Sequence, residues 1–224
     1  MTLINIGNAE IIRFDWNFIP SHMYLVRYGD KAFVVDPVDT VEVKEFILNE
    51  GIKRCMVFLT HEHFDHISGV ELIKSLCDCE VICSPVCAKN ITYASKNLSD
   101  KSDVIVMFNT GLSANGSHIE PFVCTADRSF DGELRTEWCG HSICAVSTPG
   151  HSPGSICIIL DEKYLFSGDS LLDVPTITRL PGGSREEFQR VTLPWLRDIS
   201  GSVELVLPGH GEYAAPESLL EKYS

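Results

Sequence analysis

The sequence lacks any long hydrophobic run and any basic, export-type start. No apolar stretch approaches the roughly 18 residues that a membrane-spanning helix needs. Residues 1–7 have neither the basic region nor the long apolar region of a signal peptide. We therefore expect no membrane-spanning helix and no export signal, and a cytoplasmic location is the interpretation that follows.

Basic residues are also scarce. The chain has 18 Lys and Arg against 31 Asp and Glu, which gives a net charge of −13. A nucleic-acid-binding surface needs a basic stripe, and anionic membranes attract basic residues, so neither is an expected partner. We expect a small-molecule substrate as the partner, and the oligomeric state stays open.

The nine cysteines form an odd number. Without an export signal, this count favours reduced thiols over a disulfide framework. Four of them lie close together in the sequence, namely Cys77, Cys79, Cys83 and Cys87. One interpretation of this group is a structural metal site. We favour the other, in which these residues are small core side chains near a short buried strand.

The 224 residues contain no linker and no internal repeat, so we predict one domain spanning 1–224. Strand signals alternate with helix signals along the chain, which favours two β-sheets with helices on their outer faces and an α+β fold class. Strands are expected at 2–7, 9–14, 23–28, 31–35, 55–59, 80–83, 121–124, 134–138, 143–147, 156–160, 164–167 and 203–207, and helices at 41–49, 67–76, 85–94, 184–198 and 216–223.

One short stretch concentrates residues that bind metals. Residues 61–66 read His-Glu-His-Phe-Asp-His, although the whole chain has only eight histidines. An apolar run at 55–59 precedes the stretch and predicts a buried strand, and the spacing of apolar residues over 67–76 predicts an amphipathic helix. The stretch therefore lies on a strand-to-helix turn, where side chains can converge.

The spacing within this stretch suggests two points of convergence. His61 and His63 are two residues apart, so in an extended segment their side chains point to the same side. Asp65 and His66 fall where the helix begins and can face a second point nearby. Imidazole and carboxylate groups of this kind suit Zn²⁺ and Fe²⁺.

The H-x-H-x-D-H pattern, together with three later segments, resembles the metallo-β-lactamase superfamily. The later segments are Thr-Pro-Gly-His-Ser-Pro-Gly-Ser at 148–155, Ser-Gly-Asp at 167–169 and Pro-Gly-His-Gly at 208–211. All four occur in the family's order, and the resemblance spans about residues 24 to 211. It implies an αββα sandwich that holds metal ions at one edge of its sheets.

The same resemblance implies a cofactor and a set of ligands. Two divalent metal ions are expected, with Zn²⁺ first and iron or manganese as alternatives. Asp65 would also act in catalysis by orienting the nucleophile and taking a proton. The implied ligands are His61, His63 and His151 for one ion, Asp65, His66 and His210 for the other, and Asp169 as the bridge between them.

Two segments resemble one group within the superfamily, the glyoxalase II (hydroxyacylglutathione hydrolase) group, which cleaves S-acyl-glutathione thioesters. They are the bridging Asp169 and the Leu-Pro-Gly-Gly-Ser run at 180–184. The resemblance implies a thioesterase in which a metal-bound hydroxide attacks the thioester carbonyl. The chain departs from the group beside Arg179, where a companion aspartate is absent, and after His210, where glutathione-binding members carry a further helical region.

Two alternative functions stay open on the same scaffold. One is a mononuclear iron sulfur dioxygenase that acts on a persulfide, since two histidines and one carboxylate suffice to hold iron. The other is a hydrolase of lactones, phosphodiesters or other esters, although the acidic net charge disfavours a nuclease.

A few predictions concern residues outside the motifs. Asp36, at a strand end, is either a hydrogen-bond partner of a ligand histidine or a turn cap. His22 is predicted to lie at the surface or the core edge. Residues 95–118 are predicted to form a loop, either substrate-contacting or a plain connector. His118 and His141 are expected not to bind metal, and no substrate-binding residues are identified.

Overall fold

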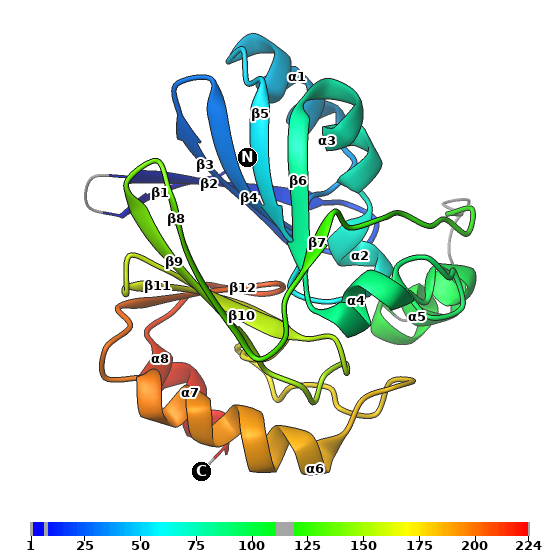
Figure 1. The fold of residues 1–224 in the computed structure, drawn as a ribbon. Coiled ribbons are helices and arrows are strands. Elements are labelled where there is room, and N and C mark those ends of the chain that lie inside the picture. Colours follow the sequence, from blue (N-terminus) through cyan, green and yellow to red (C-terminus); the bar gives the residue numbers. More distant parts are fainter. Residues whose placement is uncertain (1, 7–8, 111–118, 224) are drawn as a thin grey trace.

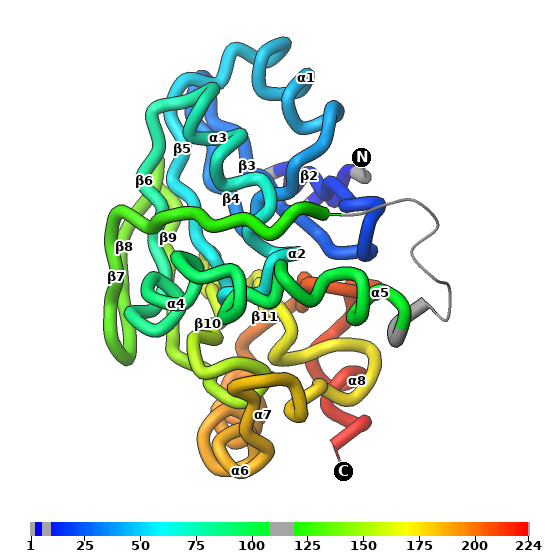
Figure 2. The backbone as a smooth tube through the Cα atoms, turned by 90° about the vertical axis from the view of Figure 1, so that its right-hand side faces the viewer, coloured from blue at the N-terminus to red at the C-terminus, as the bar shows by residue number. Residues whose placement is uncertain are grey.

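Two β-sheets pack face to face, and helices cover both outer faces (Figure 1). The computed structural model describes residues 2–6, 9–110 and 119–223. Figure 2 shows the same layers from the side, with α1 at one end of the molecule and α6 and α7 at the other. This confirms the predicted α+β class and the αββα sandwich.

The first sheet keeps the order of the sequence. Its strands run β1-β2-β3-β4-β5-β6-β7, antiparallel as far as β4 and then parallel. The hairpin between β3 and β4 turns at Gly29, whose φ of 59° suits a residue without a side chain. The strands are β1 (Thr2–Ile6), β2 (Ala9–Trp16), β3 (Ser21–Tyr28), β4 (Lys31–Val35), β5 (Arg54–Phe58), β6 (Asp78–Cys83) and β7 (Arg128–Ser129).

The second sheet has the order β12-β11-β10-β9-β8. Its strands are antiparallel except for β11 and β12, which run parallel. The strands are β8 (Glu133–Trp138), β9 (His141–Ser147), β10 (Ile156–Leu160), β11 (Tyr164–Gly168) and β12 (Leu205–Pro208).

The helices fall into two groups, and each group lies beside one of the two sheets (Figure 1). The first group is α1 (Val41–Asn49), α2 (Phe64–Ile67), α3 (Val70–Leu76), α4 (Pro85–Asn90), η1 (Ser99–Lys101) and α5 (Ser102–Thr110). The second is α6 (Arg185–Glu187), the π-helical η2 (Phe188–Thr192), α7 (Leu193–Ile199), α8 (Pro216–Leu220) and η3 (Glu221–Tyr223).

Three apolar layers hold the sandwich together. Ile47 of α1 packs in the layer between the first sheet and its helices, and Leu196 of α7 packs in the layer outside the second sheet. Between the sheets, the ring centroid of Phe33 lies 5.8 Å from those of both Phe58 and Phe166. Burial of each such side chain contributes about 1.5–3 kcal/mol. The layers therefore fix the sheet edge that carries the motif loops.

Helix α1 follows the prediction for 41–49 in both its bounds and its ends. The Thr40 hydroxyl accepts a hydrogen bond from the backbone N–H of Val43, which caps the first turn. Gly51 follows the helix with a φ of 63°, a conformation that glycine adopts without strain.

The single helix predicted at 67–76 is wrong, because the structure has two short helices, α2 and α3, with a break at Gly69. The backbone N–H of Gly69 donates to the carbonyl of Pro37. A Cβ at Gly69 would lie 2.5 Å from the carbonyl carbon of Val38. Close backbone approach therefore interrupts the helical pattern, and it holds the ligand turn against the end of β4.

The structure differs from the predictions most clearly in three other regions. The expected strand at 121–124 is absent from the described residues, and only the short β7 joins this edge of the sheet. The helix expected at 85–94 ends at Asn90. Within the predicted loop, η1 and α5 are helical, while residues 111–118, which include His118, lie outside the described residues.

The clustered cysteines support the core interpretation. Cys77, Cys83 and Cys87 are buried in the apolar layer outside the first sheet, and Cys79 packs against it. Burial raises the pKa of the Cys79 thiol to about 11, and it raises the pKa of Cys87 well above its usual value, so both stay protonated near neutral pH. No cysteine contributes to a metal-type donor group in the described part of the chain.

Among the described residues, no helix is long and apolar enough to cross a membrane.

Candidate metal centre and active site

The motif residues meet at one edge of the sandwich, because each of their loops follows the end of a strand. Residues 60–66 follow β5, and residues 148–155 follow β9. Asp169 follows β11, and His210 follows β12. Since β11 and β12 are parallel, these last two loops emerge at the same edge of the second sheet.

The side chains there form three overlapping groups, and the donor atoms within each group lie within 4.8 Å of one another. Nearly all of these residues are buried, and the His210 side chain is the most accessible of them at 24%. The structure therefore brings together all seven side chains that the sequence singled out. The groups are His61 with His63 and His151, His61 with His66 and Asp169, and Asp65 with His66 and His210.

Asp169 lies between the two histidine sets. Its Oδ2 atom is 3.4 Å from Nε2 of His151 and 3.6 Å from Nε2 of His210. Its Oδ1 atom is 3.5 Å from Nε2 of His66. One carboxylate thus reaches both groups of donors, which is the geometry expected of a bridging ligand.

Outer hydrogen bonds fix the direction of the imidazole rings. Nδ1 of His151 donates to the carbonyl of Ile177 at 2.8 Å, and Nδ1 of His210 donates to the carbonyl of Pro20 at 2.6 Å. A carbonyl can only accept, so in the neutral ring the Nε2 atom carries the lone pair. Both lone pairs then face the centre of the cluster, as metal ligation requires.

Asp36 is the hydrogen-bond partner of a candidate ligand histidine, one of the two roles that the sequence left open for it. Its carboxylate accepts hydrogen bonds from Nδ1 of His66 at 2.8 Å, from the Thr60 backbone N–H at 2.7 Å and from the Thr60 hydroxyl at 2.6 Å. Asp36 itself has a φ of 51°. This buried carboxylate therefore joins the end of β4 to the ligand turn.

Glu62 was not identified by the sequence reasoning. Its carboxylate is buried, and it accepts 2.8 Å hydrogen bonds from the Ser152 hydroxyl and from Nδ2 of Asn90. A Cβ at Gly154 would lie only 2.3 Å from Oε2 of Glu62. Glu62 thus ties the turn at 60–66 to the loop at 148–155. Alternation along the extended segment was a usable signal, since it places Glu62 opposite its two histidine neighbours.

The donor set fits cations. Nδ1 of His63 faces Nε2 of His151 at 3.0 Å, and Nε2 of His66 faces Nε2 of His210 at 3.3 Å. Nε2 of His61 and Oδ1 of Asp169 are buried without a hydrogen-bond partner. Buried polar atoms are normally paired, so convergent, unpaired nitrogen and oxygen atoms indicate a place for metal ions.

The two halves of the cluster favour different charge states of their histidines. Burial and the neighbouring His151 lower the pKa of His63 to about 3, and burial lowers that of His61 well below its usual value. Burial also opposes charge on His66 and His210, but nearby carboxylates outweigh it and raise their pKa values to about 9 and about 10. Positive charge is thus favoured in the half of the cluster that holds Asp65 and Asp169, as it would be for a bound cation.

The remaining described histidines have structural partners. His22 is buried, and its ring nitrogens lie 2.7 Å from Oδ1 of Asp15 and 2.8 Å from the carbonyl of Gly211. His22 therefore supports the loop that carries His210. His141 lies outside the cluster, with its Nδ1 atom 2.6 Å from a carboxylate oxygen of Asp161.

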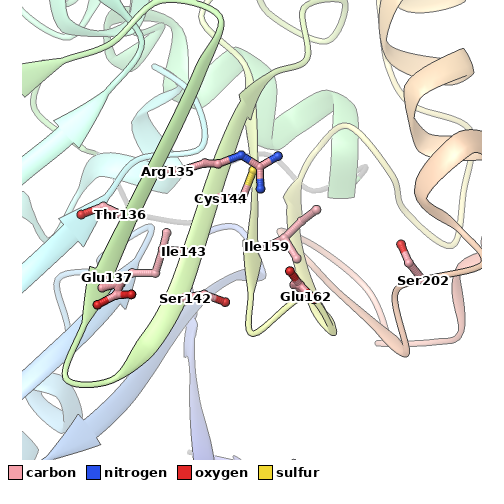
Figure 3. A pocket seen from close by; sticks show the side chains of 9 residues that line it. All are labelled: Arg135, Thr136, Glu137, Ser142, Ile143, Cys144, Ile159, Glu162 and Ser202. Carbon is pink, nitrogen blue, oxygen red and sulfur yellow. The ribbon is translucent and has the colours of Figure 1, made fainter.

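A cavity of about 380 Å³ opens beside the cluster. Five of the seven cluster residues line it, together with apolar side chains. A larger hollow of about 570 Å³ lies on the outer face of strands β8 to β10 (Figure 3). Its lining residues include Arg135, Cys144 and Glu162, and none of the seven cluster residues reaches it. The smaller cavity is therefore the candidate active site.

Comparisons with known proteins agree with this geometry. A probable metallo-hydrolase of Bacillus subtilis (strain 168), YqgX, is 27% identical to this chain over 206 residues, which is 86% of each protein. The crystal structure of BLEG-1 B3 metallo-beta-lactamase has a TM-score of 0.73 at 23% identity, with 94% of this chain and 96% of that one covered. TTHA1623 in a di-iron-bound form has a TM-score of 0.64 at 22% identity, with 92% and 96% covered.

These two structural likenesses concern the fold, because both identities are below 25%. The family model of the metallo-beta-lactamase superfamily matches residues 16–210, which include all seven cluster residues and most of the chain. The chain therefore belongs to the metallo-beta-lactamase superfamily of metallo-hydrolases.

Proposed function

We propose that this protein is a dinuclear metal-dependent hydrolase that cleaves a thioester. The observation that carries the proposal is the pair of donor groups, His61 with His63 and His151, and Asp65 with His66 and His210, which share Asp169 between them. Membership of the superfamily supports metal-dependent hydrolysis. The donors are nitrogen and oxygen atoms without a thiolate, which suits Zn²⁺ first, and iron or manganese as alternatives.

When bound, two divalent ions would lower the pKa of a water molecule to near neutrality, and their positive charge would stabilise a developing oxyanion. The chain's own residues hold and orient the reacting groups. Asp65 lines the cavity, and its Oδ2 atom lies 3.2 Å from Nε2 of His210. Burial opposes ionisation of Asp65, but His66 and its neighbours outweigh burial and lower its pKa. The ionised Asp65 carboxylate can therefore accept a hydrogen bond from the attacking water and orient it, and it can relay a proton to the leaving group without retaining it.

The overall reaction needs no further reactant. Water adds to the thioester carbonyl carbon and the C–S bond breaks. The products are a carboxylate and a thiol. One proton of the water passes through Asp65 to the sulfur, and the other is released to the solvent. His151 and His210 keep their positions because their outer ring nitrogens are held by backbone carbonyls.

The choice of a thioester draws on the resemblance to the glyoxalase II group. The Gly-Gly pair of the segment at 180–184 packs against the candidate ligand loop, since a Cβ at Gly183 would lie 2.9 Å from the carbonyl oxygen of His151. The Ser184 N–H donates to the carbonyl of Gly150. This segment therefore places Leu180 in the wall of the cavity.

The test is an assay of thiol release with zinc-reconstituted protein, a panel of thioesters and a chromogenic thiol reagent. We expect turnover that disappears after chelation and that falls by about 10²–10⁴ in Asp65→Asn, the range for loss of a general base. Absence of turnover, combined with oxygen consumption by iron-loaded protein on a persulfide, would replace this proposal with the dioxygenase. Cleavage of lactones or oxygen esters alone would refute the thioester assignment.

A further inference from the structure

The cavity beside the candidate metal centre has an apolar wall and a polar end. Its polar lining residues are His63, Asp65, His151, Asp169 and His210, and all belong to the cluster. Every other lining residue in the described part of the chain is apolar, and these residues include Ile19, Phe64, Leu98, Ile105, Ile177 and Leu180.

We propose that this cavity is an acyl pocket for an uncharged aliphatic chain, so that the preferred substrate is a thioester selected by its acyl group and not by a charged thiol such as glutathione. The inference rests on the proposed function, and it adds the substrate class. A volume of about 380 Å³ is that of a small-molecule site. Apolar contacts along the wall would hold the chain while the carbonyl lies at the polar end.

The charge of the pocket argues against glutathione. No lysine or arginine is among the described residues that line the cavity, and residues 111–118 contain neither type in the sequence. Glutathione carries two carboxylates and one ammonium group, and the apolar wall away from the candidate metal centre offers its carboxylates no cationic or hydrogen-bonding side chain. A carboxylate that leaves water without such a partner is strongly disfavoured. The net charge of −13 repels such an anion as well. A neutral acyl chain meets neither obstacle.

The inner part of the wall is buried and hydrogen-bonded to the ligand turn. Leu98 and Phe64 are each 1% exposed and pack in one apolar cluster with Ile19. The backbone N–H of Phe64 donates to the carbonyl of Asn97 at 2.9 Å, which joins this wall to the ligand turn. The position of the apolar surface is thus fixed relative to the reacting end.

The opposite wall is tied to the cluster through His151, since the carbonyl of Ile177 accepts the hydrogen bond from its Nδ1 atom. Val174 is 53% exposed and Ile177 38% exposed, so the apolar surface continues from the cavity to the solvent. A chain longer than the cavity can therefore extend along these side chains. We expect activity to rise with chain length until the rim is covered.

The first experiment compares two thiols that carry the same acyl groups. Zinc-loaded protein is assayed with acetyl, butanoyl, hexanoyl and octanoyl thioesters of N-acetylcysteamine, a neutral thiol, and of glutathione. Each methylene that enters the pocket should raise kcat/KM by about fourfold, from about 0.8 kcal/mol of transfer free energy. For equal acyl groups, the N-acetylcysteamine thioesters should react at least as well as the glutathione thioesters.

The second experiment changes the wall at one position of α5. Ile105 lines the cavity, whereas Val104, its neighbour on the same helix, is 52% exposed and does not line it. Ile105→Lys should flatten the dependence on chain length and move the preference toward glutathione thioesters. Val104→Lys is the matched control, because it adds the same charge to the same helix. It should leave both properties unchanged.

The outcomes separate the two proposals. Turnover with a flat or falling dependence on chain length, or a preference of the unaltered protein for glutathione thioesters, would overturn the acyl pocket and leave the thioesterase standing. Equal effects of Ile105→Lys and Val104→Lys would also overturn the pocket. No hydrolysis of any thioester would overturn both proposals.

Discussion

Replacing Asp36 with asparagine should weaken metal binding while the fold persists. The Asp36 carboxylate is 2% exposed and accepts three hydrogen bonds, one of them from Nδ1 of His66. Asparagine has nearly the same shape and tolerates the φ of 51° found at this position. The substitution therefore changes charge and hydrogen bonding with little change in backbone conformation.

The effect follows from the tautomer of His66. In Asp36→Asn one oxygen still accepts from the Thr60 N–H, but the amide nitrogen takes the place of the oxygen that faces His66. Nδ1 of His66 must then accept a hydrogen bond, so the ring proton moves to Nε2, which faces the cluster. Loss of such a partner typically weakens metal binding by about 10- to 100-fold, which is about 1.4–2.7 kcal/mol.

The assay is a competition titration of zinc against a chromophoric chelator, with Asp39→Asn as the matched control. Asp39 is exposed, lies three residues further along the chain and makes no side-chain contact with the cluster. The metal-free variant should lose about 1–3 kcal/mol of unfolding free energy, from imperfectly paired buried groups. Unchanged zinc affinity in a folded Asp36→Asn protein would refute the argument that Asp36 sets the tautomer of His66.

Three further predictions concern stability. Glu62→Ala leaves the hydrogen-bonding groups of Ser152 and Asn90 without their partner. Denaturant titration should therefore show that the free energy of unfolding falls by about 2–5 kcal/mol. A fall below about 0.5 kcal/mol would contradict the linking role of Glu62. Chelation should lower Tm, and an unchanged Tm in verified metal-free protein would contradict a preformed site. Metal-free protein should be most stable near pH 6.5. The pKa of His63 is lowered to about 3 in the folded protein, so stability should fall as the pH drops below 6.5. The pKa of His66 is raised to about 9, so stability should also fall as the pH rises from 6.5 to about 9. Thermal melts across pH 4–10 check this, and a monotonic profile would contradict it.

The sequence predicted the local part of the site, because that part depends on the spacing of neighbours. His61 and His63 share one side of an extended segment, and Asp65 and His66 open the next helix, as expected. The convergence of His151, Asp169 and His210 is a tertiary property. It came from resemblance and not from spacing.

Other features depended on contacts that no local pattern encodes. The break at Gly69 arises from the backbone of Pro37 and Val38, which lie some thirty residues earlier. The role of Glu62 depends on Ser152, which is ninety residues away. The apolar cavity wall is assembled from four separate stretches of chain, so its composition could be read only after the chain had folded.

The most direct test of the account is the metal stoichiometry of protein dialysed against excess zinc and then freed of unbound metal, measured by elemental analysis. The account predicts about two equivalents in the unaltered protein, as in two-metal hydrolases, and a reduced content in Asp169→Ala, which lacks the shared ligand. About one equivalent of tightly bound metal in the unaltered protein, or two equivalents retained in Asp169→Ala, would contradict the dinuclear centre with a bridging Asp169.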